Sequence, residues 1–364
     1  MKKKVRVALL YGGKSAEHEI SIISAQNIFH AIDKKKYEIV AVAIDRQGRW
    51  FLDQGARLLR DPTASAVSSA SAKNAAAVMP GEPSRPLMRP SSRQAIGAVD
   101  VVFPVLHGPF GEDGTIQGLL KLAGVAFVGA GVLGSAVGMD KDVMKRLLRD
   151  AQIAIAKFQV FERREQGAIS FTKARKALGT PLFVKPANLG SSVGISKVSR
   201  RSEFAGAIKK AFRYDDKIIV EEGIRGREIE CAVLGNEKPI ASLPGEIIVQ
   251  HDFYSYDAKY VDNQGARLEI PACLPEATVK RIQKMAVQAY RALCCEGMAR
   301  VDFFLRPNGQ VLVNEINTIP GFTKISMFPK MWEASGLSYT RLIDRLIHLA
   351  LERSRKEKRR RSSR

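Results

Sequence analysis

The chain has 364 residues, 45% of them hydrophobic, which is more than one hydrophobic core usually supports, so a folded protein of two or three domains is expected. The formal net charge is +21, but basic runs near the two ends carry about half of it, which argues against nucleic acid as the main partner. Four cysteines without metal-ligand spacing exclude a zinc site and a disulfide framework, and no apolar stretch is long enough to span a membrane, so a cytoplasmic protein is expected.

The N-terminal segment predicts the beginning of a doubly wound domain. Residues 5–13, VRVALLYGG, indicate a buried strand that runs into a glycine turn, and isoleucines spaced through residues 20–32 indicate a helix behind it. This order is typical of a doubly wound fold, in which the helix N-terminus can hold an anion. Residues 61–98 are rich in Ala, Ser and Pro without a sustained period, which predicts a surface insertion rather than a domain.

Regular structure is expected again after this insertion. Residues 99–108, VDVVFPVLHG, indicate a strand that ends at His107, and a histidine at that place fits either a structural role or a site role. A loop and helix over residues 111–124 and a strand over 125–129 follow.

Two further units are expected beyond residue 139. The first is a compact α+β unit, with helices near 139–151, 171–178 and 202–213 and strands at 157–161, 181–186, 195–199 and 217–222. The second begins near residue 227, with a hairpin at Gly235-Asn236 and long amphipathic helices at 276–294 and 338–352. The final residues, 353–364, hold eight Lys or Arg against one Glu and are expected to form a disordered basic tail.

A glycine-rich loop at residues 185–196, KPANLGSSVGIS, is a candidate phosphate site. It follows a strand that ends in Lys185, its glycines let backbone N–H groups approach phosphate oxygens, and Ser191 and Ser192 add hydroxyl donors. The P-loop pattern is absent, so this loop alone is weak evidence.

A second hairpin, RVDFFL and VLVNEIN around Pro307-Asn308-Gly309, carries polar side chains on one face. Strand alternation brings Asp302, Glu315 and Asn317 together, and such oxygen donors suit Mg²⁺ that also carries nucleotide phosphates. A salt-bridged surface strand is the alternative. Arg300 shares this face and could stabilise an oxyanion, with the Gly321 N–H as a second donor.

Eight stretches in order resemble the D-alanine--D-alanine ligases of the ATP-grasp superfamily across nearly the whole chain: GGKSAEHEIS, HGPFGEDGTIQGLL, MDK, KPANLGSSVGIS, EEGIRGREIECAVLGN, FYSYDAKY, RVDFF and NEINTIPGFT. The resemblance implies a mixed α/β and α+β fold, a three-domain ATP-grasp architecture whose N-terminal domain is doubly wound and Rossmann-like. The implied divisions are 1–137, 138–225 and 226–352. It also implies ATP as co-substrate, two Mg²⁺ ions that Mn²⁺ can replace, D-alanine as substrate, a homodimer and a place in peptidoglycan precursor synthesis.

The resemblance also assigns roles to single residues. Around the amino-acid substrates it implies Glu17 for the amino group of the first D-alanine, Ser191 hydrogen-bonded to Tyr260 of a mobile loop, Ser326 for the second carboxylate, Arg300 and Gly321 for the oxyanion, and His107. For ATP it implies Lys141, Lys185, Ser192, Glu221, Glu222, Ile224, Glu228, Lys259, Phe304 and Asn314. The metal ligands would be Asp302, Glu315 and Asn317.

The activity that this family implies has two steps: ATP phosphorylates the carboxyl of the first D-alanine, and the amine of the second D-alanine displaces the phosphate. A ligase that takes D-lactate or D-serine second is the alternative within the family. The FYSYDAKY form with Tyr260 resembles the dipeptide-forming members and favours D-alanine. A nucleic-acid-binding protein is the alternative from another class, and it leaves the cluster of Asp302, Glu315 and Asn317 unexplained.

Overall fold

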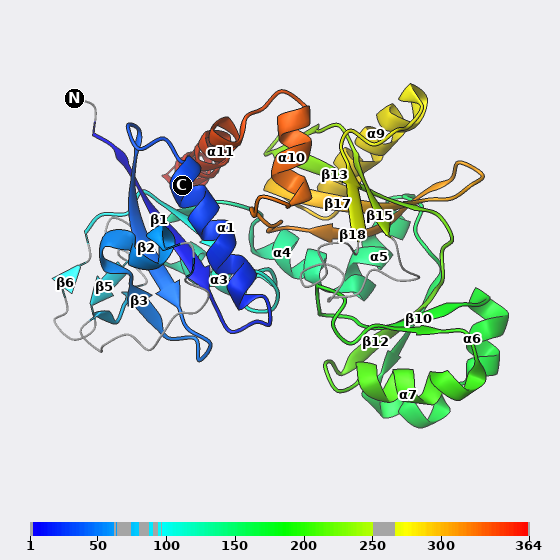
Figure 1. Ribbon diagram of the computed structural model, residues 1–364. Helices are drawn as coiled ribbons and strands as arrows, with labels where there is room; N and C mark the ends of the chain where they lie inside the picture. The colour runs from blue at the N-terminus through cyan, green and yellow to red at the C-terminus, as the bar shows by residue number, and fades with distance from the viewer. Residues whose placement is uncertain are drawn as a thin grey trace.

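The computed structural model describes residues 3–61, 63, 74–79, 87–89, 94–95, 97–249 and 266–362. Three main sheets, each with its own helices, follow one another along the chain (Figure 1). The middle sheet lies apart from the first and third, which are bridged by the last helices of the chain.

The first sheet has five strands in the order β3-β2-β1-β7-β8, and all neighbours except β2 and β3 are parallel. Its elements are β1 (Val5–Gly12), α1 (His18–Ala31), β2 (Tyr37–Ile44), β3 (Trp50–Leu52), a short helical turn (Gln54–Ala56), α2 (Arg57–Arg60), β7 (Val101–Val105), α3 (Thr115–Leu122) and β8 (Ala126–Phe127).

Both faces of this sheet are buried, as the apolar run in β1 predicts. Val7 and Leu9 belong to a core shared with α1, whereas Ala8 and Leu10 belong to one shared with α3. Helices on both faces of a parallel sheet confirm the predicted doubly wound arrangement.

The middle sheet is antiparallel, in the order β11-β10-β12-β9, and a core of its own packs it against α6 and α7. Its elements are β9 (Phe158–Glu162), a helical turn (Arg163–Ala168), α6 (Phe171–Leu178), β10 (Leu182–Pro186), β11 (Ser196–Val198), α7 (Arg201–Ala211) and β12 (Lys217–Glu222). The glycine-rich loop therefore joins two paired strands, β10 and β11, as the sequence predicts.

The third sheet is also antiparallel, in the order β16-β15-β13-β17-β18 with β14 beside β13. Its elements are β13 (Arg227–Gly235), β14 (Ile240–Ala241), β15 (Gly245–Val249), β16 (Ala266–Glu269), α9 (Glu276–Ala292), β17 (Gly297–Leu305), β18 (Val311–Asn317), α10 (Met327–Ala334) and α11 (Tyr339–Ser362). Both predicted hairpins, β13–β14 and β17–β18, are confirmed.

Alternation along β17 separates the core from the site. Val301, Phe303 and Leu305 are buried in a core shared with α9, while Arg300 and Asp302 point to the opposite face. Helix α5 (Lys141–Asp150) packs into the same core, and the carboxylate of Asp140 caps it by accepting the N–H groups of residues 142 and 143.

Three features differ from the sequence prediction. Helix α4 (Val132–Met139), which precedes α5, was not predicted, because its mix of Gly, Ala and Val lacks a clear helical period. The insertion at 61–98 contains three short strands, β4 (Ala77–Val78), β5 (Leu87–Arg89) and β6 (Gln94–Ala95), which form a small sheet. Leu87 is buried in the core of the first sheet, so the described part of this insertion is not wholly superficial.

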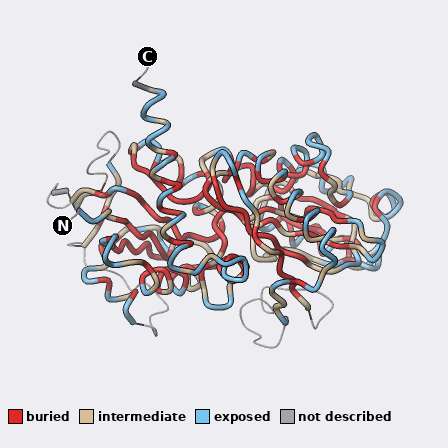
Figure 2. Tube along the Cα trace, turned by 90° about the horizontal axis from the view of Figure 1, so that it is seen from above, coloured by how far each residue is buried: buried red, intermediate tan, exposed pale blue. Residues whose placement is uncertain are grey.

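The third difference concerns the basic C-terminal segment. The expected disordered tail is wrong for residues 353–362, because α11 continues through them to Ser362 and its end projects from the body (Figure 2). Arg353 is only 8% exposed and donates hydrogen bonds to the carbonyls of Gly129 (2.7 Å) and Phe127 (2.8 Å). These contacts hold the helix against the end of β8.

Helix α11 also packs in an unexpected place. Its apolar side chains, Leu342, Ile343, Leu346 and Ile347, lie in the same core as Val7 of β1. The C-terminal helix thus covers the first sheet, although it follows the third along the chain.

Among the described residues, no helix has the length and apolarity needed to cross a membrane, and the four cysteines are free thiols.

Candidate active site

The β17–β18 hairpin sets the geometry of the site. Asp302 lies opposite Glu315 and Arg300 lies opposite Asn317, so all four side chains share one face, as predicted. Phe303 lies opposite Val313, which leaves Asn314 as an extra residue in a β-bulge. The sequence pattern did not predict this bulge, which changes the direction of the side chains on either side of it.

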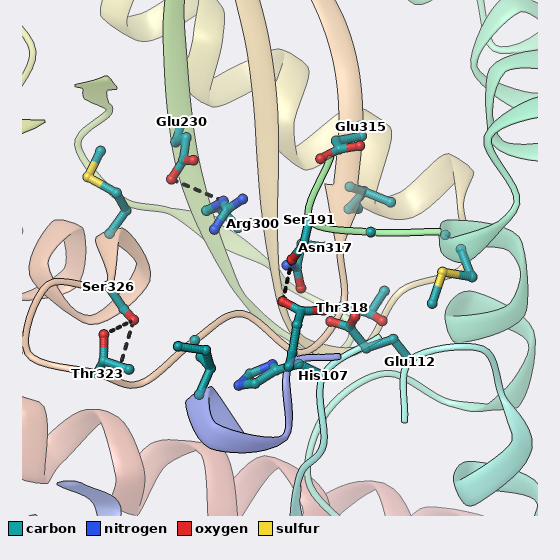
Figure 3. Close-up of a pocket in the computed structure, with 18 of the residues that line it drawn as sticks. His107, Glu112, Ser191, Glu230, Arg300, Glu315, Asn317, Thr318, Thr323 and Ser326 are labelled. Atoms are coloured by element: carbon teal, nitrogen blue, oxygen red, sulfur yellow. Dashed lines mark hydrogen bonds and ion pairs between the residues drawn. The ribbon is translucent and has the colours of Figure 1, made fainter. Parts of the chain in front are cut away.

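Arg300 is held by two carboxylates. Its Nε and Nη2 donate to Oδ1 and Oδ2 of Asp302, both at 2.7 Å. Its Nε also lies 3.0 Å from Glu230, a contact that Figure 3 shows. Burial alone would lower the pKa of Arg300, but Asp302 and Glu230 raise it well above its ordinary value. A fixed, permanently charged guanidinium therefore faces the site.

The oxygen donors near Arg300 suit a divalent metal ion that is also bound by nucleotide phosphates. Glu315 lies 3.6 Å from Lys141, and Asn317 accepts the N–H of Ile319 at 3.1 Å. No group of three His, Cys, Asp or Glu side chains within the described ranges could hold a metal. Two carboxylates and an amide oxygen nevertheless fit Mg²⁺, which usually takes its remaining ligands from phosphates and water.

A cavity of about 270 Å³, here called the Arg300 cavity, lies between the first and third sheets. It is lined by six of the seven residues that the resemblance assigns around the amino-acid substrates, namely Glu17, His107, Ser191, Arg300, Gly321 and Ser326. Glu17 comes just before α1, and its carboxylate accepts a hydrogen bond from the Ser191 hydroxyl. Ser191 and Ser192 both adopt positive φ, at 51° and 60°, a conformation that is costly outside glycine and clusters at functional sites.

Neutral His107 helps to shape this cavity. Burial lowers its pKa, and its Nδ1 lies 3.0 Å from the carbonyl of Ile319, so Nδ1 carries the proton and donates it there. Its Nε2 lies 3.5 Å from the hydroxyl of Ser24, which accepts the N–H of Phe322 at 3.1 Å. Helix α1 and the end of β7 thus fix the loop that contains Gly321.

That loop needs a glycine for close packing. A Cβ atom at Gly321 would lie 2.8 Å from the Ser326 hydroxyl, which itself bonds to the backbone and side chain of Thr323. The absence of a side chain lets the Gly321 backbone lie next to Ser326, and both residues line the Arg300 cavity.

A second cavity of about 540 Å³, here called the Lys185 cavity, lies between the middle and third sheets. Nine of the ten residues expected to bind ATP line it: Lys141, Lys185, Ser192, Glu221, Glu222, Ile224, Glu228, Phe304 and Asn314. The tenth, Lys259, and Tyr260 lie outside the described residues. Asp302 lines neither cavity and is paired with Arg300.

A buried trio of charges lies at one side of the Lys185 cavity: Lys185 and Glu221 line the cavity, and Lys145 is buried behind them. Glu221 forms an ion pair with Lys145 through one oxygen and accepts from Lys185 at 2.5 Å through the other. Burial alone would raise the pKa of Glu221, but the two ammonium groups lower it to about 2. Glu221 therefore stays ionised and Lys185 is held in place.

Sequence reasoning missed Lys145, Ser24 and Glu112. Lys145 is four residues after Lys141, so helical spacing could have placed both on one face. Ser24 carries no such signal, because its role depends on packing against a loop that lies almost three hundred residues further along the chain. Glu112 lies within the recognised stretch HGPFGEDG but was not singled out.

Comparison with known proteins gives a consistent result. Family models described as the N-terminus and the C-terminus of D-ala D-ala ligase match residues 6–130 and 147–348. A D-alanine--D-alanine ligase of Oceanobacillus iheyensis is 51% identical over 100% of this chain and 99% of its own. Among solved structures, the D-alanine-D-alanine ligase of Coxiella burnetii has 43% identity and a TM-score of 0.84, covering 98% of this chain and 96% of that one. The VanG D-Ala:D-Ser ligase of Enterococcus faecalis has 38% identity and the same TM-score, covering 96% of this chain and 100% of its own.

Proposed function

The chain belongs to the D-alanine--D-alanine ligase family, and on that premise we propose that the Lys185 cavity holds ATP and the Arg300 cavity holds two molecules of D-alanine. The chain is an ATP-dependent ligase that joins D-alanine to D-alanine. One observation supports the assignment of the two cavities: Lys141, Ser191 and Glu315 line both of them. A terminal phosphate held in one cavity therefore reaches the edge of the other.

In the first step the carboxylate of the first D-alanine attacks the terminal phosphorus of ATP. A carboxyl–phosphorus bond forms, the bond to the bridging oxygen breaks, and ADP leaves. Lys141 and Lys185 would offset the charge on the phosphates, with Ser192 as a further donor. Glu221, Glu222, Ile224, Phe304 and Asn314 would surround the adenine and Glu228 the ribose. Glu17 would hold the ammonium group of the amino acid.

In the second step the free amine of the second D-alanine attacks the activated carboxyl carbon. Arg300 and the Gly321 N–H would stabilise the oxyanion before the phosphate leaves with its bonding electron pair, and the amine loses a proton. Ser326 would bind the carboxylate of this second D-alanine, and neutral His107 would hold the loop that presents Gly321.

Asp302, Glu315 and Asn317 are the residues that would hold two Mg²⁺ ions, with Mn²⁺ as a substitute. A bound divalent ion supplies charge neutralisation at the phosphates and orients them. Lys259 remains a proposed contact of the ATP phosphates, and Tyr260 remains the proposed partner of Ser191.

D-Alanine is favoured as the second substrate over D-serine or D-lactate. The relatives described as D-alanine--D-alanine ligases reach 52% identity, whereas the D-Ala:D-Ser ligase reaches 38%. We also propose a cytoplasmic homodimer that serves peptidoglycan precursor synthesis, and sedimentation of the purified protein would test its oligomeric state.

The direct experiment gives purified protein ATP, Mg²⁺ and D-alanine and follows phosphate release together with the dipeptide. We expect one phosphate per dipeptide, and little product when D-lactate replaces the second D-alanine. Phosphate release that needs no D-amino acid would point to another reaction of the superfamily.

A further inference from the structure

Glu112 lines the Arg300 cavity, and the proposed mechanism does not use its carboxylate. The residue lies in the turn between β7 and α3, and its Oε2 accepts the N–H of Gly108 at 2.7 Å. Its Oε1 is buried and has no hydrogen-bond partner in the part of the chain that the structure describes. Glu112 lines the cavity and lies beside Thr318 and near His107 (Figure 3).

The carboxylate of Glu17 lies against the same glycine. A Cβ atom at Gly108 would be 3.1 Å from Oε2 of Glu17, while the N–H of Gly108 points to Glu112. Gly108 has a φ of 74° and no side chain, so the two carboxylates meet across it. Two like charges this close are unfavourable without a cation between them.

The other groups around this carboxylate pair do not supply that cation. His107 is neutral because burial lowers its pKa, and the guanidinium of Arg300 is already paired with Asp302 and Glu230. The backbone N–H groups of Gly108 and Ile319 also lower the pKa of Glu112, and the N–H of Ile319 donates its hydrogen bond to Asn317.

We propose that Glu112 is a substrate-binding residue, whose Oε1 accepts a hydrogen bond from the ammonium group of the first D-alanine while Glu17 accepts another. An ammonium group has three N–H donors and no acceptor, so two carboxylates on one side of it are complementary in charge and in hydrogen bonding. This inference rests on the proposed function and adds the second anchor of its first substrate.

Binding is accompanied by loss of a proton. Burial and the charge of Glu17 raise the pKa of Glu112 to about 8, so at pH 7 the empty cavity holds this carboxyl protonated. The arriving ammonium group favours the ionised form, and the proton of Glu112 passes to the buffer. Up to one proton is therefore released for each first D-alanine bound.

The main test is the variant Glu112→Gln. The amide keeps the size of the side chain and an acceptor for the N–H of Gly108, but it carries neither charge nor a titratable proton. We expect the KM of the first D-alanine to rise about 10-fold to 100-fold, the usual effect of losing a charged hydrogen bond. The KM values of the second D-alanine and of ATP should change by less than about 2-fold.

The matched control is Glu19→Gln. Glu19 lies two residues after Glu17 on α1, but its carboxylate faces the surface and pairs with Arg46. This variant should keep all three KM values, because exposed ion pairs contribute little. A wild-type KM for the first D-alanine in Glu112→Gln would overturn the proposal.

Calorimetry gives a readout besides activity. D-Alanine is titrated into the protein with a non-hydrolysable ATP analogue at pH 7, in phosphate and in Tris, whose ionisation enthalpies differ. Wild type should release close to one proton and Glu112→Gln none, whereas Glu112→Asp should keep the release with weaker binding. Absence of proton release from wild type overturns the proposal even if the variants fold poorly. If wild type binds D-alanine but makes no dipeptide, the proposed function fails and this inference stands.

Discussion

Arg300 combines two properties at the scale of a single residue: its charge is permanent and its position is fixed by Asp302 and Glu230. We expect Arg300→Ala to lower kcat about 100-fold to 1,000-fold, since removal of one oxyanion donor has effects of that size. Steady-state kinetics with D-alanine and ATP would measure it.

The chain offers a matched control in Arg267→Ala. Arg267 also pairs with an acidic residue two positions away on its own strand, Glu269, but it is exposed. Its loss should leave kcat unchanged. Near-normal turnover of Arg300→Ala would refute the role of Arg300.

Lys145 is a second residue with a testable effect. Lys145→Met leaves the buried Glu221 with only Lys185 as a counter-charge, and we expect the free energy of unfolding to fall by about 3 kcal/mol. Urea unfolding without ATP would measure the change. The double variant Lys145→Met, Glu221→Gln should recover part of the loss, because no unbalanced carboxylate remains, and the absence of recovery would contradict the charge argument.

Glu112 makes stability depend on pH. Its pKa is raised from 4.5 to about 8 in the folded protein, so between these values the unfolded chain binds fewer protons than the folded one. The free energy of unfolding therefore receives a contribution that falls as the pH rises from about 4.5 to about 8. Relative to wild type, Glu112→Gln should gain about 2 to 4 kcal/mol between pH 4 and pH 8.5. Unfolding at the two pH values would test this, and equal differences at both would contradict it.

At the scale of elements, the sequence predicted the strands and hairpins whose apolar residues follow a local period. The β17–β18 hairpin follows from alternating apolar residues around Pro307-Asn308-Gly309, and the shared face of Asp302 and Glu315 follows with it. The bulge at Asn314 could not be predicted, because an unpaired residue depends on the register chosen by both strands. Likewise, charge alone indicated a disordered tail, whereas the buried contacts of Arg353 and the ion pair of Lys356 with Glu237 hold this part of the helix against the body.

Truncation tests how α11 is held. A chain that ends after Ser354 keeps the contacts of Arg353 with Gly129 and Phe127, whereas one that ends after Glu352 loses them. We expect the shorter chain to be about 2 kcal/mol less stable, since two carbonyls lose a charged, buried donor. Thermal and urea unfolding of both chains would show the difference, and equal stability would mean that Arg353 does not anchor the helix.

At the scale of the whole molecule, the site depends on contacts that sequence patterns do not contain. Glu17 and Ser191 meet from different sheets, and Ser24 contacts the backbone of Phe322. The family resemblance identified Glu17 and Ser191 because both lie in motifs of the family, whose site residues come from distant parts of the chain. The resemblance did not identify Ser24 or Lys145, because their roles depend on how elements of different sheets and loops pack together.

Nucleotide binding should stabilise the molecule as a unit, because the Lys185 cavity is lined by both the middle and the third sheet. A non-hydrolysable ATP analogue with Mg²⁺, at 100 times its Kd, should add about 2.7 kcal/mol to the free energy of unfolding. Replacing Mg²⁺ with EDTA should remove most of this gain. An equal gain with EDTA would contradict the proposed role of Asp302, Glu315 and Asn317.

The packing of α11 against β7 and β8 of the first sheet has a consequence for how the protein is made. The strands of the first sheet are synthesised roughly two hundred residues before Leu342 and Leu346 of α11. During that interval, the core on one face of the sheet lacks the side chains that α11 contributes. The packing of the first sheet is therefore completed only after the third sheet has been made.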